Sequence, residues 1–306
     1  MKILITDPVD ADGLGILRRN GYTIRDYADI RKEEYENELP SVDGWILRSG
    51  TTITAADLSR AQQLKVIGRA GVGLDNIDTK TASERGITVL NTPDANTIAV
   101  AEHVMGLILT LLRHTVAGHQ MIASGQWNRH QLIGNECYGK TLGIVGLGKI
   151  GRAVAERAQA FGMTLIGYDP YVNVTDLPGV NIQPVAKDLL IETADIITLH
   201  VPAITETENL VDATFLAAMK SSAYLINCAR GRIVNETALI EALMKHEIAG
   251  AAMDVFRTEP PENYERLARC PNIVLTPHLG AATQEAKKRV SVEICTRLVA
   301  YLKSGA

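Results

Sequence analysis

Three polar side chains in the C-terminal half are of the types that oxidise a hydroxy acid or reduce the matching oxo acid. Arg230 occurs in Asn-Cys-Ala-Arg-Gly-Arg, Glu259 in Asp-Val-Phe-Arg-Thr-Glu-Pro-Pro and His278 in Thr-Pro-His-Leu-Gly. A guanidinium can form two parallel hydrogen bonds with a carboxylate and polarise the neighbouring carbonyl. An imidazole can take the hydroxyl proton, and a carboxylate beside it stabilises the imidazolium form. Taken singly, the three could equally be a surface cation, a loop acid and a helix cap.

A glycine-rich turn in the middle of the chain has the spacing of a dinucleotide-binding site. After the strand-like run Thr141–Val145, Gly146, Gly148 and Gly151 follow the pattern GxGxxG. The first glycine allows the tight turn, the second lets the backbone approach a pyrophosphate, and the third lets the next helix pack close to the strand. Asp169 ends the next strand, where a carboxylate accepts hydrogen bonds from ribose hydroxyls and repels a 2′-phosphate. The pattern therefore predicts a dinucleotide site, for which the alternative is an ordinary turn followed by a surface aspartate. The aspartate favours NAD over NADP as the dinucleotide.

These residues need parallel strands to bring them together, and the hydrophobic pattern predicts such strands. Short apolar runs alternate with amphipathic helical stretches such as Ala11–Asn20 and Thr54–Ala61. This alternation is typical of two doubly wound α/β domains, in which ligands bind at the carboxyl ends of the strands. The predicted strands are Lys2–Thr6, Tyr22–Tyr27, Gly44–Arg48, Leu64–Arg69, Thr88–Asn91, Thr141–Val145, Thr164–Tyr168, Ile196–His200, Ala223–Asn227, Gly250–Asp254 and Ile273–Leu275.

Two longer helical patterns frame the second strand series. Residues 97–123 read as one long helix, interrupted only mildly by Gly106 and Gly118, and suggest a connector between domains. Thr283–Leu302 reads as a final helix.

Composition narrows the class of protein. The 306 residues suffice for two domains, and the net charge of -4 argues against nucleic-acid or anionic-membrane partners. The longest apolar stretch, near Val104–Leu112, is too short to cross a bilayer, and the N-terminus lacks the layout of a signal peptide. The four cysteines show neither CxxC pairing nor metal-ligand spacing, so we expect no metal, reduced thiols and a cytoplasmic location.

Nearly the whole chain resembles the D-isomer-specific 2-hydroxyacid dehydrogenase family. The catalytic arginine, glutamate and histidine of that family fall on Arg230, Glu259 and His278. The resemblance implies a Rossmann NAD-binding domain, residues 95–279, inserted in a flavodoxin-like substrate domain formed by residues 1–94 and 280–306. It also implies further cofactor contacts, beyond the glycines and Asp169, at Lys149, Ile150, Val201, Pro202, Cys228, Ala229, Arg230, Asp254, His278 and Gly280.

Within the family, the N-terminal half is most similar to the D-3-phosphoglycerate dehydrogenases. The similarity lies in Gly68-Arg-Ala-Gly-Val-Gly-Leu-Asp-Asn-Ile-Asp78 and in residues 91–103. It implies oxidation of 3-phosphoglycerate in serine biosynthesis. The sequence stops at Ala306 without the C-terminal regulatory domains that many such enzymes carry, so it is either a short, unregulated form or a truncated one. Several arginines meeting at one pocket would suit a phosphate. The residues implied around the substrate are Arg48, Ser49, Arg69, Ala70, Gly71, Asn96, Arg129, Arg230 and His278.

Other functions remain open from the sequence. The same chemistry would serve a hydroxypyruvate or glyoxylate reductase or a sulfolactate dehydrogenase, which differ in the substrate pocket rather than in the catalytic trio. An NAD-sensing corepressor-like binding protein is an alternative of another class, although the chain shows no basic region for chromatin. The resemblance further implies a homodimer through the NAD-binding domains, with contacts along the helix after Thr97 and near Trp127. The apolar stripe of that helix could equally be buried within one subunit.

Overall fold

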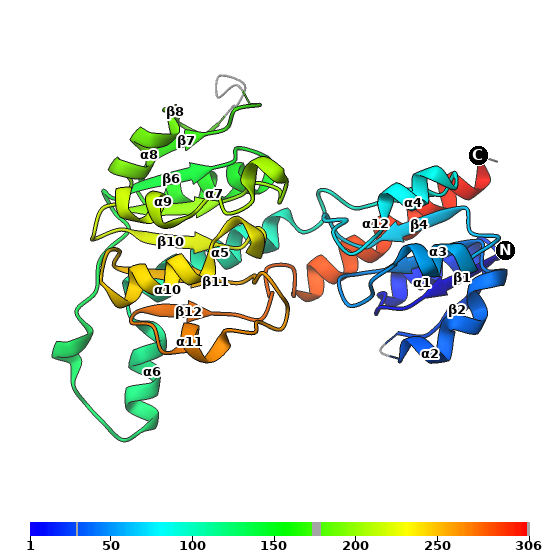
Figure 1. The fold of residues 1–306 in the computed structure, drawn as a ribbon, viewed down its shortest axis with the longest axis horizontal. Helices are drawn as coiled ribbons and strands as arrows, with labels where there is room; N and C mark the ends of the chain where they lie inside the picture. The colour runs from blue at the N-terminus through cyan, green and yellow to red at the C-terminus, as the bar shows by residue number, and fades with distance from the viewer. Residues whose placement is uncertain (29, 173–178, 305–306) are drawn as a thin grey trace. The chain divides into compact units, whose positions relative to one another are not determined.

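The computed structural model describes residues 1–304 with the exception of residue 29 and residues 173–178. The chain forms two compact units (Figure 1): unit 1 comprises Met1–Thr97 and Ala281–Ala306, and unit 2 comprises Ile98–Gly280. The boundaries expected from the sequence, after residues 94 and 279, differ from these by one to three residues. The substrate and cofactor roles assigned to the two regions stay predictions.

Unit 1 is built on a parallel sheet in the order β2-β1-β3-β4-β5. Its strands are β1 (Lys2–Ile5), β2 (Thr23–Asp26), β3 (Gly44–Leu47), β4 (Val66–Arg69) and β5 (Thr88–Leu90). Each lies within a predicted strand. The order is that of flavodoxin-like sheets, which confirms the fold predicted for this part of the chain.

Helices cover both faces of the unit 1 sheet. They are α1 (Ala11–Arg19), α2 (Lys32–Tyr35), α3 (Ala55–Arg60), α4 (Thr79–Glu84), α12 (Gln284–Lys303) and the 3-10 helix η1 (Glu36–Ser41). Successive strand residues point to opposite faces, so Leu4 joins the core under α3 and α4, whereas Ile3 joins the core under α1 and α12. Gly68 leaves room for Ile294 of α12, because a Cβ there would lie 2.9 Å from Ile294 Cγ1. The C-terminal helix is thereby seated on the N-terminal strands.

Unit 2 is built on a seven-stranded parallel sheet in the order β12-β11-β10-β9-β6-β7-β8. Its strands are β6 (Thr141–Val145), β7 (Thr164–Tyr168), β8 (Ile182–Pro184), β9 (Ile196–Leu199), β10 (Tyr224–Asn227), β11 (Gly250–Met253) and β12 (Ile273–Leu275). The direction of winding reverses between β6 and β9, as in Rossmann sheets, where a dinucleotide binds at this reversal. The predicted doubly wound fold is confirmed, although β8 was not predicted.

The helices of unit 2 also form two layers. They are α5 (Thr97–Leu112), α6 (Thr115–Ala123), α7 (Lys149–Ala160), α8 (Lys187–Thr193), α9 (Ala213–Ala218), α10 (Glu236–Met244) and α11 (Tyr264–Ala268), with the 3-10 helices η2 (Arg129–Leu132), η4 (Thr205–Thr207) and η5 (Gly231–Ile233). On one face, Ile144 packs in a core with residues of α5 and α7. On the other, Val145 packs with residues of α8 to α11. Strands buried on both faces explain the nearly continuous apolar runs in the sequence.

The prediction of one helix over residues 97–123 is wrong. The helix breaks after Leu112, and α6 continues at 62° to α5. The break falls at His114, whose φ of 51° is left-handed, and not at Gly106 or Gly118. The Leu112 carbonyl accepts a hydrogen bond from Asn135 N at 2.8 Å, so a distant segment ends α5. Among the described residues, no single helix is long and apolar enough to span a membrane, and only this bent pair passes on length and composition.

Candidate active site

The polar residues predicted to do chemistry follow neighbouring strands of unit 2. Arg230 follows β10, Glu259 follows β11 and His278 follows β12. All strands in the sheet are parallel, so these residues emerge from the same edge. This edge is where open α/β sheets bind ligands.

His278 and Glu259 form a direct pair. The distance between His278 Nδ1 and Glu259 Oε2 is 2.7 Å, and both side chains are about two-fifths exposed, at 41% and 39%. Phe256 N also donates to Glu259 Oε1 at 3.2 Å. Burial acts to raise the pKa of Glu259, but the hydrogen bond and charge of His278 outweigh it and leave that pKa lowered. Since Nδ1 is bonded to the carboxylate, Nε2 is the ring nitrogen available to a substrate.

The backbone of His278 has an unusual conformation. Its φ is 54°, in the left-handed region that non-glycine residues seldom occupy. Its N–H donates to the carbonyls of Asp254 at 2.8 Å and Thr276 at 3.0 Å. Such a conformation costs about 1 kcal/mol or more and persists only where surrounding contacts impose it.

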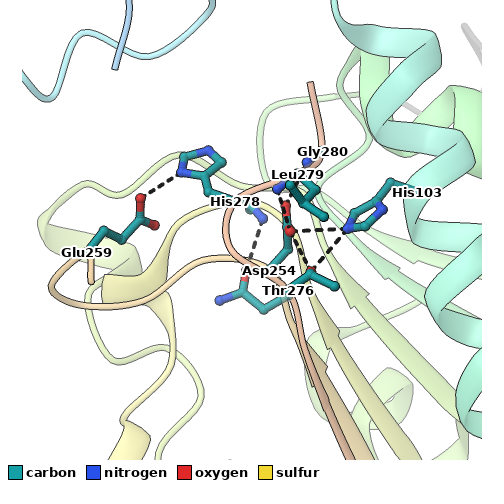
Figure 2. Close-up of polar contacts among 9 residues, drawn as sticks. His103, Asp254, Glu259, Thr276, His278, Leu279 and Gly280 are labelled. Atoms are coloured by element: carbon teal, nitrogen blue, oxygen red, sulfur yellow. Dashed lines mark hydrogen bonds and ion pairs between the residues drawn. The ribbon is translucent and has the colours of Figure 1, made fainter. Parts of the chain in front are cut away.

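Asp254 provides those contacts. It is fully buried, and its carboxylate accepts hydrogen bonds from Leu279 N at 2.7 Å and Gly280 N at 2.9 Å. Burial acts to raise its pKa, but hydrogen bonds from His103, Thr276 and Leu279 outweigh it, so the pKa is lowered and the group is ionised. Figure 2 shows Asp254 on the side of the loop facing His103, while the ring of His278 turns toward Glu259. The cofactor contact expected of Asp254 stays a prediction.

Sequence reasoning missed His103. Its Nε2 lies 3.1 Å from Asp254 Oδ1 and 3.2 Å from Thr276 Oγ1. The one signal available was a histidine within the apolar helix pattern that became α5. A lone histidine there is more often an ordinary core residue, so this signal does not identify a site.

The Arg230 turn is shaped by its neighbours. Asn227 Nδ2 donates to the Arg230 carbonyl at 3.0 Å, and Arg230 Nη1 donates to the Ala229 carbonyl at 2.7 Å. Gly231 packs against the loop after β11, since a Cβ there would lie 1.9 Å from the Phe256 carbonyl carbon. The turn that carries Arg230 is therefore in contact with the loop that carries Glu259.

The glycine turn fits a dinucleotide. Gly146 has a φ of 96°, and a Cβ on Gly151 would lie 2.1 Å from the Gly146 carbonyl oxygen. A Cβ on Gly148 would meet nothing within 4 Å, so space is open beside the turn. Gly148 caps α7, whose first amide groups and positive dipole end suit a pyrophosphate. The turn therefore meets the shape and charge requirements of NAD.

Asp169 also shapes this turn. Its Oδ2 accepts from Leu147 N at 2.8 Å, and its Oδ1 accepts from Tyr171 N at 2.8 Å. A carboxylate has about four acceptor positions, so capacity for ribose hydroxyls remains. The aspartate thus links the glycine turn to the end of β7.

The other predicted cofactor residues lie on the same unit. Lys149 and Ile150 form the first turn of α7, and Val201 Cγ1 lies where it would be 2.9 Å from a Cβ on Gly146. The remainder are strand-end residues of the β9, β10 and β12 loops, namely Pro202, Cys228, Ala229 and Gly280. Their contacts with a cofactor stay predictions.

Unit 1 holds most of the predicted substrate residues at its own strand ends. Arg48 and Ser49 follow β3, Arg69 ends β4, and Ala70, Gly71 and Asn96 follow in the adjoining loops. Burial lowers the pKa of Arg48, with Asp7 acting against that effect. The Arg69 guanidinium occupies the space in which Gly71 would carry a Cβ. Arg129 is instead exposed on η2 of unit 2.

Two polar residues that sequence reasoning missed hold the loop after β3. Asp7 Oδ2 accepts from Arg48 N at 2.6 Å and from Thr51 N at 3.1 Å. Asn76 Nδ2 donates to the carbonyls of Arg48, at 2.7 Å, and Thr51. They act through contacts far apart in sequence, which no local pattern reveals.

Comparison with known proteins gives the same fold and related chemistry. Residues 105–280 match the family model for the NAD binding domain of D-isomer specific 2-hydroxyacid dehydrogenases. A D-3-phosphoglycerate dehydrogenase of Synechocystis sp. is 43% identical over 297 residues, covering 97% of this chain and 53% of that protein. A hydroxypyruvate reductase of Thermotoga maritima is 40% identical over 299 residues, covering 97% of both chains. The chain thus spans about half the length of the first relative, at 53%, and nearly all of the second, at 97%.

A solved structure supports the comparison. The NAD-dependent formate dehydrogenase of Staphylococcus aureus in complex with NAD matches with a TM-score of 0.89 and 34% identity. The match covers 100% of this chain and 97% of that one. The fold therefore extends over both units, in a protein whose named substrate differs from those of the two relatives.

Proposed function

Because this chain belongs to the D-isomer-specific 2-hydroxyacid dehydrogenase family, we propose that it interconverts a D-2-hydroxy acid and the matching 2-oxo acid with NAD as cofactor. The first proposed substrate is 3-phosphoglycerate, oxidised to 3-phosphohydroxypyruvate in the first step of serine synthesis. The observation that carries the proposal is the His278–Glu259 pair, 2.7 Å apart, at a strand edge shared with Arg230 and the glycine turn.

His278 is the proposed base. Its Nε2 takes the hydroxyl proton of the substrate during oxidation and returns a proton during reduction. Glu259 orients the ring through Nδ1 and stabilises the imidazolium that forms. Arg230 binds the substrate carboxylate with its guanidinium fork and polarises the adjoining carbonyl. When bound, NAD supplies the acceptor for the hydride that leaves the substrate carbon.

The residues proposed to hold the cofactor are those of the glycine turn and Asp169. The α7 N-terminus and the turn amides suit the pyrophosphate, while Asp169 suits the ribose hydroxyls and disfavours a 2′-phosphate. The family model matched by residues 105–280 and the NAD complex of a relative support this assignment.

Phosphate recognition is assigned to unit 1, as the substrate domain. Arg48 and Arg69, with Ser49 and Asn96, are proposed to surround the substrate, and Arg129 of unit 2 is proposed to add a further positive charge. The D-3-phosphoglycerate dehydrogenases at 38–43% identity support this choice. Hydroxypyruvate is the second candidate substrate. The hydroxypyruvate reductase of Thermotoga maritima supports it, because this chain covers 97% of that protein but only 53% of the Synechocystis enzyme. Glyoxylate and sulfolactate remain within the same chemistry.

The test follows NADH absorbance with 3-phosphohydroxypyruvate, hydroxypyruvate, glyoxylate, pyruvate and sulfopyruvate. We expect kcat/KM to be highest for 3-phosphohydroxypyruvate. A higher value for an unphosphorylated acid would overturn the phosphate assignment and keep the dehydrogenase chemistry. Binding of NADH without turnover of any acid would support the NAD-sensing protein instead.

An arginine variant sharpens the substrate test. Arg69→Gln should raise KM for 3-phosphohydroxypyruvate about 10- to 100-fold, the loss expected for a hydrogen bond to a charged group, and should change KM for hydroxypyruvate little. Arg85→Gln is the matched control, because Arg85 lies before β5 at the opposite edge of the same sheet. Equal effects on both substrates would remove Arg69 from phosphate recognition.

A homodimer and a cytoplasmic location complete the proposal. Figure 1 shows α6 extending away from the sheet of unit 2, and α6 has no buried residue. The exposed apolar side chains on and after it include Ile122, Trp127 and Ile133, at 55%, 82% and 79% exposure. A second copy would cover such a surface. Light scattering should give the mass of a dimer, and Ile122→Glu with Trp127→Ser should give a monomer; a monomeric parent protein would overturn the dimer.

A further inference from the structure

We infer that His103 is a positioning residue for His278 and acts through the buried carboxylate of Asp254. The two histidines need no direct contact. His103 forms a hydrogen bond with Asp254, and Asp254 in turn fixes the conformation of the loop 276–280, which carries His278. The kinetic consequence rests on the proposed function, whereas the structural consequence does not.

The loop is attached to Asp254 on both sides of His278. Before it, Thr276 Oγ1 donates to Asp254 Oδ1 at 2.5 Å. After it, Leu279 N and Gly280 N donate to Oδ1 and Oδ2. At the centre, His278 N donates to the Asp254 carbonyl. One aspartate therefore imposes the left-handed backbone of His278, whose cost these contacts offset.

His103 is the remaining donor to this carboxylate, and it comes from a different element. An ionised carboxylate only accepts hydrogen bonds, and the Thr276 hydroxyl hydrogen is already directed to Asp254. Nε2 of His103 lies within 3.2 Å of Asp254 Oδ1 and of Thr276 Oγ1, so it must carry a hydrogen. Figure 2 shows the ring reaching the carboxylate from α5. Asp254 is fully buried, so losing this donor cannot be made good by bulk water.

Metal binding is the competing interpretation of the same group. Ligand atoms of His103, Cys228 and Asp254 lie within 4.8 Å of one another. Burial raises the pKa of the Cys228 thiol well above its ordinary value, so the thiolate that a metal requires is disfavoured. Both Asp254 oxygens already accept hydrogen bonds from the loop. The contacts thus favour loop positioning.

The experiment compares two replacements of His103. His103→Leu removes the donor, whereas His103→Gln restores an N–H group at about the reach of Nε2. Glu102→Gln is the matched control, since Glu102 directly precedes His103 on α5 and its 63% exposed carboxylate pairs with Arg157.

The first readout needs neither cofactor nor turnover. Amide hydrogen exchange in the unliganded protein should be about tenfold or more faster at Leu279 and Gly280 in His103→Leu, because their opening becomes easier. His103→Gln and Glu102→Gln should exchange like the parent protein. Unchanged exchange at both amides in His103→Leu would overturn the inference. Exchange that quickens equally throughout α5 and the sheet would also overturn it, since that indicates general destabilisation.

The second readout is kinetic. His103→Leu should lower kcat about 10- to 100-fold, as expected when a catalytic group is misplaced by about 1 Å, with a smaller change in KM. His103→Leu should also shift the apparent pKa of the base in the pH profile of kcat/KM. His103→Gln should restore both kcat and this apparent pKa. If the parent protein turns over none of the tested acids, the proposed function fails, yet the exchange result still decides the role of His103.

Discussion

At the scale of single residues, His278 depends on its backbone contacts as much as on those of its ring. Glu259 bonds Nδ1 and leaves Nε2 for the substrate, while the amide of His278 is held by the carbonyls of Asp254 and Thr276. Two carboxylates thus contact different parts of the His278 segment. Glu259 pairs with the ring, and buried Asp254 accepts hydrogen bonds from the amides of Leu279 and Gly280.

Replacing the base tests the chemical assignment. His278→Gln should lower kcat by about 10²- to 10⁴-fold, the usual contribution of general acid–base catalysis. NADH binding, followed by its fluorescence, should remain near that of the parent protein because the glycine turn is intact. Glu259→Gln should give a smaller loss, since the ring keeps its place but loses the stabilising charge. Near-normal turnover in His278→Gln would remove the base assignment.

Asp169 gives a separate test of cofactor choice. Asp169→Ala removes the carboxylate that accepts a hydrogen bond from Leu147 N and that is proposed to disfavour a 2′-phosphate. NAD affinity should fall about tenfold, as for loss of one hydrogen bond involving a charge, and the preference for NAD over NADP should narrow. Affinities for both cofactors are measured by titration calorimetry. An unchanged NAD-to-NADP ratio contradicts the ribose assignment.

At the scale of elements, the two glycines at the start of α7 serve different purposes, one in packing and the other in the proposed binding of NAD. Gly151 is needed for folding, because any Cβ there collides with the Gly146 carbonyl. Gly148 faces open space, so folding alone would tolerate a side chain. The proposed dinucleotide, which would approach the backbone closely here, accounts for the glycine.

Two alanine variants test this separation. Gly151→Ala should lower the stability by about 1–3 kcal/mol, typical of overpacking, and is measured by urea unfolding. Gly148→Ala should unfold like the parent protein and yet lose NAD affinity, measured by calorimetry. The reverse pattern, with Gly148→Ala unstable and Gly151→Ala stable, is incompatible with the described turn.

At the scale of the whole molecule, buried ionisable groups make stability depend on pH. Burial lowers the pKa of His200, which follows β9, from 6.5 to about 3. Between these two values the unfolded chain binds a proton that the folded chain excludes. The stability that a neutral His200 contributes is therefore fully present above pH 6.5 and falls as the pH drops toward 3, at a limiting rate of about 1.4 kcal/mol per pH unit.

Urea unfolding between about pH 4 and about pH 7, from above the lowered pKa of His200 to just above the ordinary histidine value, measures this effect. His200→Gln should be less stable at neutral pH but should lose less stability on acidification. His246→Asn, a variant of an exposed histidine that follows α10, is the control and should follow the parent protein. Identical pH slopes in all three proteins would exclude a His200 that stays neutral in the folded protein.

Features that depend on near neighbours along the chain could be predicted from the sequence. Strand and helix periods predicted every strand but β8, and the glycine spacing predicted the β6–α7 turn. Parallel strands end at one edge, so a residue following a strand could be assigned to that edge without knowing its partners. This is why Arg230, Glu259 and His278 could be proposed together as one site.

Contacts that join distant segments could not be predicted from the sequence and became visible in the folded chain. His103 and Asp254 are 151 residues apart, and no local pattern selects one partner among all possible ones. The same holds for Asp7 with the Arg48 loop, 41 residues away. The end of α5 is a third case: its own residues favour a longer helix, but Asn135 takes the Leu112 carbonyl. Hydrogen bonds between remote segments form only after the chain has packed, so they override local preference without leaving a sequence signal.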